Sequence, residues 1–281
     1  MAHAADPPRL TVVVVTHNSR RDLDGCLGSL SQHAPKVPHT IVVVDSGSTD
    51  GTPALIRARW PAVRVLEPGR NVGFARANNL AIDATRSELV LLLNPDTVVP
   101  AGAVDALVAD LDAHPDAAVV GPRIVDGEGH AELSWGPMPS PLAELRQKCL
   151  VRANDRRWPV VAPWIDRLAR QARWPDWVTG ACLLIRRADL QAAGRFDERY
   201  FLYNEDVDLC AAVRARGRRI RFSPVAEVVH LRGRSGGPSA RTEYHRSHLA
   251  FYEKHRPAWA PALRWYLKLR RRLPDTTAQG R

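Results

Sequence analysis

An apolar run, Leu89 to Leu93, stops abruptly at the polar sequence Asn94-Pro95-Asp96-Thr97. A run this short between turn residues is typical of a strand buried on both faces of a sheet. Pro95 cannot donate to a central ladder, so the strand ends before it and Asp96 lies just past its carboxyl end. Open α/β sheets bind their ligands at that edge. The pattern favours a functional role for Asp96 over a helix cap, because a proline and a glycine separate it from the next helical segment.

A second carboxylate occupies an equivalent position earlier in the chain. The apolar run Thr40 to Val44 continues into the polar turn Asp45 to Gly51, which precedes a helical segment, Thr52 to Trp60. The turn lacks the ligand and glycine spacing of an EF-hand loop, and it carries neither a Walker lysine nor a G-x-G-x-x-G fingerprint. Asp45 and Asp96 are therefore predicted to reach the same sheet edge.

Apolar runs and amphipathic segments alternate through the first half of the chain. The expected strands are 10–15, 40–44, 63–66, 89–93 and 117–120, and the expected helices between them include 21–31, 74–84 and 103–113. This β-α-β alternation predicts an α/β fold with a mainly parallel central sheet and flanking helices.

Residues 130 to 178 interrupt the alternation. Five tryptophans and several prolines crowd a stretch with little strand pattern, so we expect an irregular excursion over the sheet rather than a separate domain. Regular structure is expected again as a strand at 182–185, a helix at 204–215 and two short strands at 220–222 and 227–230.

Three carboxylates begin the helix that is expected after this excursion. Asn204 is a suitable N-cap, and Glu205, Asp206 and Asp208 fall in the first turn, where the helix dipole favours anions. That placement alone explains the acids, and it would lower their pKa values. The aromatic sequence that leads into them, Phe196 to Tyr203, can instead shield a carboxylate and keep it basic. We take a catalytic carboxylate as the stronger hypothesis.

Positive charge is concentrated at the C-terminal end. The chain has a formal net charge of +10, and residues 214–281 contain 17 Lys and Arg against 4 Asp and Glu. Such a block suits the phosphates of nucleic acid, anionic lipid or a polyprenyl diphosphate, and it also fits a solvated tail. Within it, Ala262 to Leu273 is predicted to form a helix with Leu263, Tyr266 and Leu267 on one face. This face either docks on an anionic membrane or packs back on the domain.

Length and composition indicate a soluble globular protein. The 281 residues suit one large core, and 45% of them are hydrophobic. The four cysteines lack C-x-x-C spacing, which argues against a disulfide framework or a structural zinc site and for a reducing cytoplasm. The N-terminus has no apolar core of signal-peptide length, and no later run approaches the roughly 20 residues of a membrane span.

Seven motifs follow one another along the chain: Val14 to Asn18, Val44 to Gly51, Asn71 to Asn78, Leu93 to Asp96, Gly180 to Arg186, Phe196 to Leu209, and His230. In this order they resemble the motifs of family 2 glycosyltransferases with the GT-A fold, in particular the bacterial rhamnosyltransferase-like members. The resemblance covers about residues 9 to 235. Each motif alone is weak, and together they are specific.

The resemblance implies a divalent cation, Mg²⁺ or Mn²⁺, on the diphosphate of a nucleotide sugar. Asp96 matches the second acid of the family's D-x-D motif, and His230 matches a histidine that often completes the metal site. The motif reads Asn94-Pro95-Asp96 in this chain, with one charged ligand where two are usual, so the metal affinity should be modest.

The resemblance also assigns the other site residues. Asp206 matches the catalytic base that takes a proton from the acceptor, with Glu205 and Asp208 orienting the base or the acceptor. Asp45 matches the acid that binds the nucleoside. The whole nucleotide-sugar site is expected to include Thr16, Asn18, Asp45, Ser46, Asn71, Gly73, Arg76, Asn94 and Asp96.

The implied enzyme is an inverting glycosyltransferase. It would move a sugar, a deoxyhexose such as rhamnose, from a dTDP- or UDP-sugar to a saccharide or a polyprenyl-diphosphate-linked acceptor. A GT-A domain is expected over residues 1–235, with its nucleotide-sugar half at about 9–122 and its acceptor half at about 123–235, followed by a basic helical extension at 236–281. The expected location is the cytoplasm, with peripheral binding to the inner face of the plasma membrane through the extension.

Two other functions are compatible with parts of the sequence. A catalytically inactive nucleotide-sugar-binding or scaffold protein would need Asp45 and Asp96 but not Asp206. A nucleic-acid-binding protein would use the basic tail, but the sequence has no RNA-recognition, helix-turn-helix or zinc-finger signature, so no nucleic-acid partner is expected.

Overall fold

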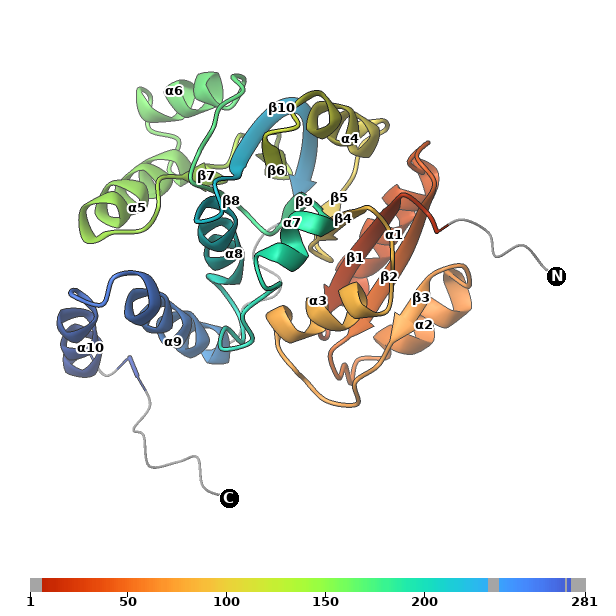
Figure 1. Cartoon of the computed structure of the whole chain (residues 1–281), viewed down its shortest axis with the longest axis horizontal. Coiled ribbons are helices and arrows are strands. Elements are labelled where there is room, and N and C mark those ends of the chain that lie inside the picture. Colours follow the sequence, from red (N-terminus) through yellow and green to blue (C-terminus); the bar gives the residue numbers. More distant parts are fainter. Residues whose placement is uncertain (1–6, 232–237, 271, 274–281) are drawn as a thin grey trace.

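The computed structural model describes residues 7–231, 238–270 and 272–273 of the chain. Its main sheet consists of β1 (Leu10–Thr16), β2 (His39–Asp45), β3 (Arg64–Leu66), β4 (Leu89–Leu93), β5 (Thr97–Val98), β6 (Ala117–Val125), β9 (Cys182–Arg186) and β10 (Arg219–His230). The strands lie in the order β3-β2-β1-β4-β9-β6-β10-β5, and helices cover both faces (Figure 1). The predicted α/β fold is confirmed.

The helices of the first half are α1 (Arg20–Gln32), α2 (Thr52–Arg59), α3 (Phe74–Asp83) and α4 (Ala103–Ala113). Successive side chains of a strand point to opposite faces, and β1 is apolar on both. Val12 and Val14 pack in the cluster that contains α1 and α4, whereas Val13 and Val15 pack in the cluster that contains α3. Helices on both faces therefore require a strand that is hydrophobic throughout.

The main sheet is mainly parallel, as predicted, but one antiparallel strand lies at its centre. β9 lies between β4 and β6 and is antiparallel to both, while β3, β2, β1 and β4 are parallel to one another. Because β9 runs against β4, its first residue Cys182 pairs with Leu93, the last residue of β4. The segment that precedes β9 consequently lies beside the Asn94 turn, where the Asn94 amide donates to the carbonyl of Ala181 (2.9 Å).

The expectation of an irregular stretch at 130–178 is wrong for much of that stretch. It contains α5 (Pro141–Asp155), α6 (Val161–Leu168) and a small hairpin of β7 (Trp135–Gly136) and β8 (Trp177–Val178). Leu142 and Leu145 of α5 are 78% and 61% exposed. Because these leucines do not face a core, the sequence lacks the apolar periodicity by which a helix is recognised.

The two short strands expected at 220–222 and 227–230 are one strand, β10. Pro224 lies within it, where the pairing with β6 shifts register between Ser223 and Glu227. Proline is tolerated in a strand at such an irregularity, where no ladder hydrogen bond is required of it.

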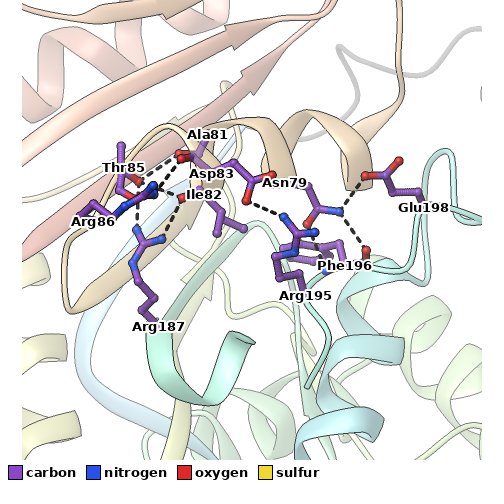
Figure 2. Close-up of polar contacts among 10 residues, drawn as sticks. All are labelled: Asn79, Ala81, Ile82, Asp83, Thr85, Arg86, Arg187, Arg195, Phe196 and Glu198. Atoms are coloured by element: carbon purple, nitrogen blue, oxygen red, sulfur yellow. Dashed lines mark hydrogen bonds and ion pairs between the residues drawn. The ribbon is translucent and has the colours of Figure 1, made fainter. Parts of the chain in front are cut away.

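Helix α3 is fastened to the segment that follows α7 (Arg187–Ala192) and leads into α8 (Glu205–Arg214). The Asn79 side chain donates to the Phe196 carbonyl (3.0 Å) and accepts from its amide (3.2 Å), as Figure 2 shows. Arg187 donates to the carbonyl of Ile82 (2.8 Å) and to the hydroxyl of Thr85 (2.9 Å), at the C-terminal end of α3 (Figure 2). These bonds fix the start of the 196–204 loop relative to the first half of the sheet.

Two helices follow the sheet, α9 (Pro238–His255) and α10 (Ala260–Leu269). Leu267 is buried and Leu263 packs in a cluster with Phe251 and Tyr200, so this side of α10 faces the domain. Tyr266, which we expected on the same face, is 43% exposed.

The predicted boundary at 235/236, Arg271 and residues 274–281 lie outside the described residues. Among the described residues, no helix has both the length and the apolar character that crossing a bilayer requires.

Part of the C-terminal positive charge has partners within the fold. Arg214, Arg218, Arg219 and Arg221 form ion pairs with aspartates from several elements, namely Asp176, Asp189, Asp116 and Asp110. The basic residues that are available to a ligand are therefore fewer than the charge balance of the sequence indicates.

Candidate active site

The carboxyl ends of β1 and β2 meet at one edge of the sheet. Thr16 and Asp45 are register partners, and the Ser46 amide donates to the Thr16 carbonyl (2.8 Å). Nδ1 of His17 lies 2.8 Å from the Ser46 carbonyl oxygen. The ends of β1 and β2 thus meet here, and His17, a histidine that we did not select as a site residue, takes part in the contact.

Two buried polar atoms at this edge have no hydrogen-bond partner within the described part of the chain. They are Oγ1 of Thr16 and Oδ2 of Asp45, in residues that are 1% and 2% exposed. The other oxygen of Asp45 accepts from the amide of Ser48 (2.9 Å). Buried polar groups are nearly always paired, so these atoms fit a ligand with hydroxyl or N–H groups, such as a nucleoside.

A pocket of about 370 Å³ opens beside this edge. Six of the predicted site residues line it, from four separate segments of the chain. They are Ser46, Asn71, Gly73, Asn94, Asp96 and His230. The sequence motifs therefore converge in space.

The far wall of the pocket is the loop Phe201 to Tyr203. The Phe74 amide donates to the Phe201 carbonyl (2.7 Å), and a Cβ on Gly73 would lie 2.6 Å from that oxygen. Gly73 is required for this approach. Tyr203 and Asn204 both have positive φ, 70° and 65°, which is rare for tyrosine and marks a constrained turn into α8.

Asn204 occupies the N-cap position that we predicted, but its side chain does not cap the helix. A capping side chain requires extended backbone at this residue, whereas Asn204 is left-handed. Only its carbonyl takes part, by accepting from the amide of Asp208 (2.8 Å).

Asp96 and His230 lie together in the lining of the pocket. Thr97 pairs with His230 across β5 and β10, which brings His230 Nε2 within 3.3 Å of Asp96 Oδ1. Nδ1 of His230 lies 3.5 Å from Glu132, a buried residue that sequence reasoning missed. Burial lowers the pKa of His230, but the carboxylates of Asp96 and Glu132 outweigh it and raise that pKa to about 9.

This cluster suits a divalent cation. A carboxylate oxygen and an imidazole nitrogen are both accepted ligands of such ions, and the two carboxylates that favour a positive imidazole favour any cation there. The described residues contain no group of three or more candidate ligands. Asp96 and His230 would therefore hold a cation together with oxygens of a bound diphosphate.

Asp206 is positioned by the segment that lies beside the Asn94 turn. The Gly180 amide donates to Oδ2 of Asp206 (2.7 Å), and the next residue, Ala181, accepts from the Asn94 amide (2.9 Å). A Cβ on Gly180 would lie 3.2 Å from that of Asp206, so the glycine permits the approach. Two hydrogen bonds therefore connect Asp206 to the turn that carries Asp96.

Burial makes the two acids at the start of α8 basic. Burial raises the pKa of Asp206, although the amides of Gly180 and Val207 oppose the shift. The pKa of Glu205 is raised well above its usual value by burial and, secondarily, by the charge of Asp206. Both pKa values thus shift upward, opposite to the direction expected from the helix dipole alone, and a raised pKa is what a general base requires.

Glu205 is expected to make the stability of the protein depend on pH. A group with a raised pKa in the folded state stabilises the fold most when it is protonated, and this contribution is lost as the pH rises from 4.5 through the raised value. Glu205→Gln should therefore melt higher than the wild-type protein at alkaline pH and show a flatter dependence of Tm on pH. Glu128→Gln, at an 81% exposed side chain, is the control. Identical slopes for the wild type and Glu205→Gln would contradict the burial argument.

Three predicted residues have other contacts. Asp208 is buried and accepts from Tyr200 (3.1 Å) and Lys254 (2.9 Å), with Nε2 of His255 at 2.6 Å, so it joins α8 to α9. Arg76 lies 3.9 Å from Glu198. Asn18 accepts from the Thr49 amide (2.7 Å) and so joins the loops after β1 and β2. None of the three is among the residues that line the pocket, and the same holds for Thr16, Asp45, Glu205 and Asp206.

Comparison with known proteins gives the same family over most of the chain. Residues 11–177 match the family model described as glycosyl transferase family 2. The chain is 35% identical over 284 residues to an N-acetylglucosaminyl-diphospho-decaprenol L-rhamnosyltransferase of Mycobacterium tuberculosis, covering 92% of this chain and 89% of that protein.

Solved structures share the fold at lower sequence identity. The mannosyltransferase PcManGT from Pyrobaculum calidifontis, in complex with GDP-Man and Mn²⁺, superposes with a TM-score of 0.61 at 20% identity, over 94% of this chain and 70% of that one. GalNAc-T7 with UDP, GalNAc and Mn²⁺ gives a TM-score of 0.60 at 17% identity, over 88% of this chain and 50% of that one.

Proposed function

The chain belongs to glycosyl transferase family 2, and we propose that it transfers a rhamnosyl group from a nucleotide-diphosphate donor to a sugar linked through diphosphate to a polyprenyl lipid. One observation carries the mechanism: Asp206 is joined through Gly180 and Ala181 to the turn that holds Asp96. A basic carboxylate therefore lies next to the place where a diphosphate would be held. The sugar and the acceptor that we propose are those in the name of the 35% identical relative, an N-acetylglucosaminyl-diphospho-decaprenol L-rhamnosyltransferase.

The donor nucleoside would lie over the ends of β1 and β2. Oγ1 of Thr16 and Oδ2 of Asp45 are suited to accept from its N–H or hydroxyl groups, because they have no partner in the described protein. Ser46 and Asn71 would line the path toward the diphosphate. The hydroxyl of Ser46 donates a hydrogen bond to Oδ1 of Asn71 (3.1 Å).

Asp96 and His230 would hold the cation, Mg²⁺ or Mn²⁺, whose role is to neutralise the negative charge that develops on the leaving diphosphate. Mn²⁺ accompanies the nucleotide ligands in both related structures. Glu132 would orient the imidazole through Nδ1, which leaves Nε2 on the side of Asp96.

Asp206 would act as the general base. It takes the proton of the acceptor hydroxyl, whose oxygen then bonds to the anomeric carbon as the bond from that carbon to the diphosphate breaks. Because the attack occurs opposite the leaving group, the anomeric configuration inverts. The transition state resembles an oxocarbenium ion, and the raised pKa of Asp206 increases its ability to take the proton.

Donor choice can be tested by thermal shift with a panel of nucleotide sugars, each with and without Mn²⁺. A ligand at 100 times its Kd stabilises a protein by about 2.7 kcal/mol, so the true donor should raise Tm by several degrees and should need the metal to do so. We expect dTDP-rhamnose to give the largest shift. A larger shift with a UDP- or GDP-sugar would contradict the proposed donor.

The outer face of α10 is suited to an anionic membrane surface. Trp265 and Leu269, one turn apart on the helix, are 68% and 64% exposed, and the neighbouring Trp259 and Tyr266 are 54% and 43% exposed. Aromatic rings are stable at the depth of lipid headgroups, and each basic residue near an anionic leaflet adds about 1 kcal/mol. We propose that this face, rather than the Leu263 and Leu267 face that packs on the domain, holds the enzyme beside its lipid-linked acceptor.

The double variant Trp265→Ser with Leu269→Ser should co-sediment with phosphatidylglycerol vesicles at least about tenfold more weakly than the wild type, because it loses two apolar side chains that enter the interface. Its Tm should not change, since both side chains are exposed. Val225→Ser, at a 59% exposed valine in β10, is the matched control. If the double variant binds these vesicles as the wild type does, α10 is not the docking face.

A further inference from the structure

A second groove, of about 550 Å³, lies between α5, α9 and α10. These three helices gather on the side of the molecule away from β1 to β3 (Figure 1). The exposed leucines Leu142 and Leu145 lie on α5, and the exposed Trp265 and Leu269 lie on α10. The groove therefore lies between two helices that present apolar side chains to solvent.

A row of aromatic rings connects this groove to the pocket of the candidate active site. Tyr203 lines that pocket, and its ring centroid lies 5.8 Å from the ring of Tyr244, which lines the groove. The row continues along α9 to His248 (5.7 Å from Tyr244) and Tyr252 (5.0 Å from His248). Residues four apart share one face of a helix, so the row forms a continuous aromatic surface.

Cations surround the groove. Its lining includes Lys148 and Arg152 from α5 and Arg270 and Arg272 from the end of the chain. Glu144 is the acidic residue among those that line it, and it accepts from Lys148 (3.0 Å), with His248 at 2.8 Å. One carboxylate does not balance four cations, so the groove has a net positive charge, which suits an anionic ligand.

His245 gives the groove a polar atom that lacks a partner. The residue is 8% exposed, and its Nδ1 is buried with no hydrogen-bond partner in the described part of the chain. Burial lowers the pKa of His245, and the charges of Arg272, Lys148 and Arg241 act in the same direction. His245 thus lines the same groove as Lys148 and Arg272, an arrangement that suits a bound phosphate.

We propose that this groove binds the diphosphate and the first isoprene units of the lipid-linked acceptor. The inference rests on the proposed function for the identity of the acceptor, and it adds a site for the part of that molecule that does not react. The cations would pair with the diphosphate, the aromatic row would cover the isoprene units, and the exposed apolar residues of α5 and α10 would border the exit of the chain into the bilayer. Tyr203 would stand between the acceptor sugar and its diphosphate.

Isothermal titration calorimetry of the full chain with farnesyl diphosphate, a soluble prenyl diphosphate, tests the proposal. The wild-type protein should bind farnesyl diphosphate more tightly than inorganic pyrophosphate, because both the anion and the chain are recognised. Lys148→Gln and Arg272→Gln should each weaken the binding of farnesyl diphosphate about tenfold, the typical effect of losing one charge-assisted contact. Arg246→Gln, on α9 but not among the residues that line the groove, should bind as the wild type does.

The outcomes separate this proposal from the proposed function. Unchanged affinity of Lys148→Gln and Arg272→Gln for farnesyl diphosphate, in variants with normal Tm, would overturn the groove assignment, as would equal affinity for farnesyl diphosphate and pyrophosphate. Binding to phosphatidylglycerol vesicles without binding to farnesyl diphosphate would assign the charges to ordinary lipid headgroups and also overturn it. Donor binding, measured on the same samples, should be equal in all variants; its absence in every sample, wild type included, would count against the proposed function instead.

Discussion

Asp206→Asn is expected to lower the turnover number by a factor of about 10² to 10⁴, the usual contribution of a general base. The substitution keeps the shape of the side chain, and the one amide oxygen of asparagine can still accept from Gly180 (2.7 Å), so the site should stay assembled. The variant loses the ability to take the acceptor proton, together with the bond that the second oxygen accepts from the neighbouring Val207 amide (2.8 Å). Steady-state kinetics at saturating donor and acceptor would measure the loss, and calorimetry should show unchanged donor affinity.

The neighbouring acids supply matched controls for this prediction. Glu205→Gln should reduce turnover less than Asp206→Asn, and if it reduces turnover more, Glu205 is the base. Asp208→Asn should instead lower Tm, because Asp208 is bonded to Tyr200 and Lys254 in the contact between α8 and α9. Each of the three variants replaces one carboxylate oxygen with an amide nitrogen. Comparing their turnover and their Tm therefore separates effects on catalysis from effects on folding.

Asp96→Ala is expected to abolish donor binding that depends on Mn²⁺. The carboxylate is the charged ligand that the Asn94-Pro95-Asp96 turn offers to the metal. In other proteins, residues that do not touch the metal but hydrogen-bond one of its ligands already contribute 10- to 100-fold to metal affinity. The loss at Asp96 should therefore exceed about 100-fold. Titration of the donor in saturating Mn²⁺, with the variant and the wild type side by side, would measure it.

Glu132 provides a graded comparison for the same site. It contacts His230 through Nδ1 (3.5 Å) and does not line the pocket, so Glu132→Gln should weaken binding of Mn²⁺ by less than Asp96→Ala does. Unchanged donor affinity in Asp96→Ala at saturating Mn²⁺ would rule out the role that we propose for Asp96.

The sheet edge could be predicted because its signals are local. Five apolar residues between turn residues are typical of a short buried strand, and the structure begins and ends β4 at the predicted residues, Leu89 and Leu93. Parallel strands place their carboxyl ends at one edge of the sheet. The position of Asp45 and of the Asn94 to Asp96 turn at that edge could therefore be predicted without knowledge of any tertiary contact. The direction of β9 depends on contacts between distant segments, and a short apolar run carries no information about it.

Helix position separates two acids of one predicted motif. Asp206 and Asp208 are adjacent in the acidic motif, but residues two apart on a helix do not face the same way. Asp208 turns toward α9 and Asp206 toward Gly180. Glu132 could not have been selected, because a single acid in a loop has no pattern, and its function depends on its distance from His230, which is 98 residues away in the chain.

The C-terminal helix illustrates a different limit. Apolar residues occur all around α10, so periodicity alone did not reveal which side packs on the domain. The structure places Leu267 inside and leaves Trp265 and Leu269 exposed. Packing on the domain therefore leaves a second, exposed apolar side of the same helix, which is the side that we propose to dock on the membrane.

The central claim is that this pocket transfers a sugar to a lipid-linked acceptor, and a transfer assay tests it most directly. The protein would be incubated with dTDP-rhamnose, Mn²⁺ and N-acetylglucosaminyl-diphospho-polyprenol, and the lipid products would be analysed by mass spectrometry. The account predicts a lipid that has gained one deoxyhexose, with release of an equal amount of dTDP, and no such product from Asp206→Asn on the same timescale. Donor binding without transfer, with this donor and with a full panel of other nucleotide sugars, would identify an inactive nucleotide-sugar-binding protein and contradict the account.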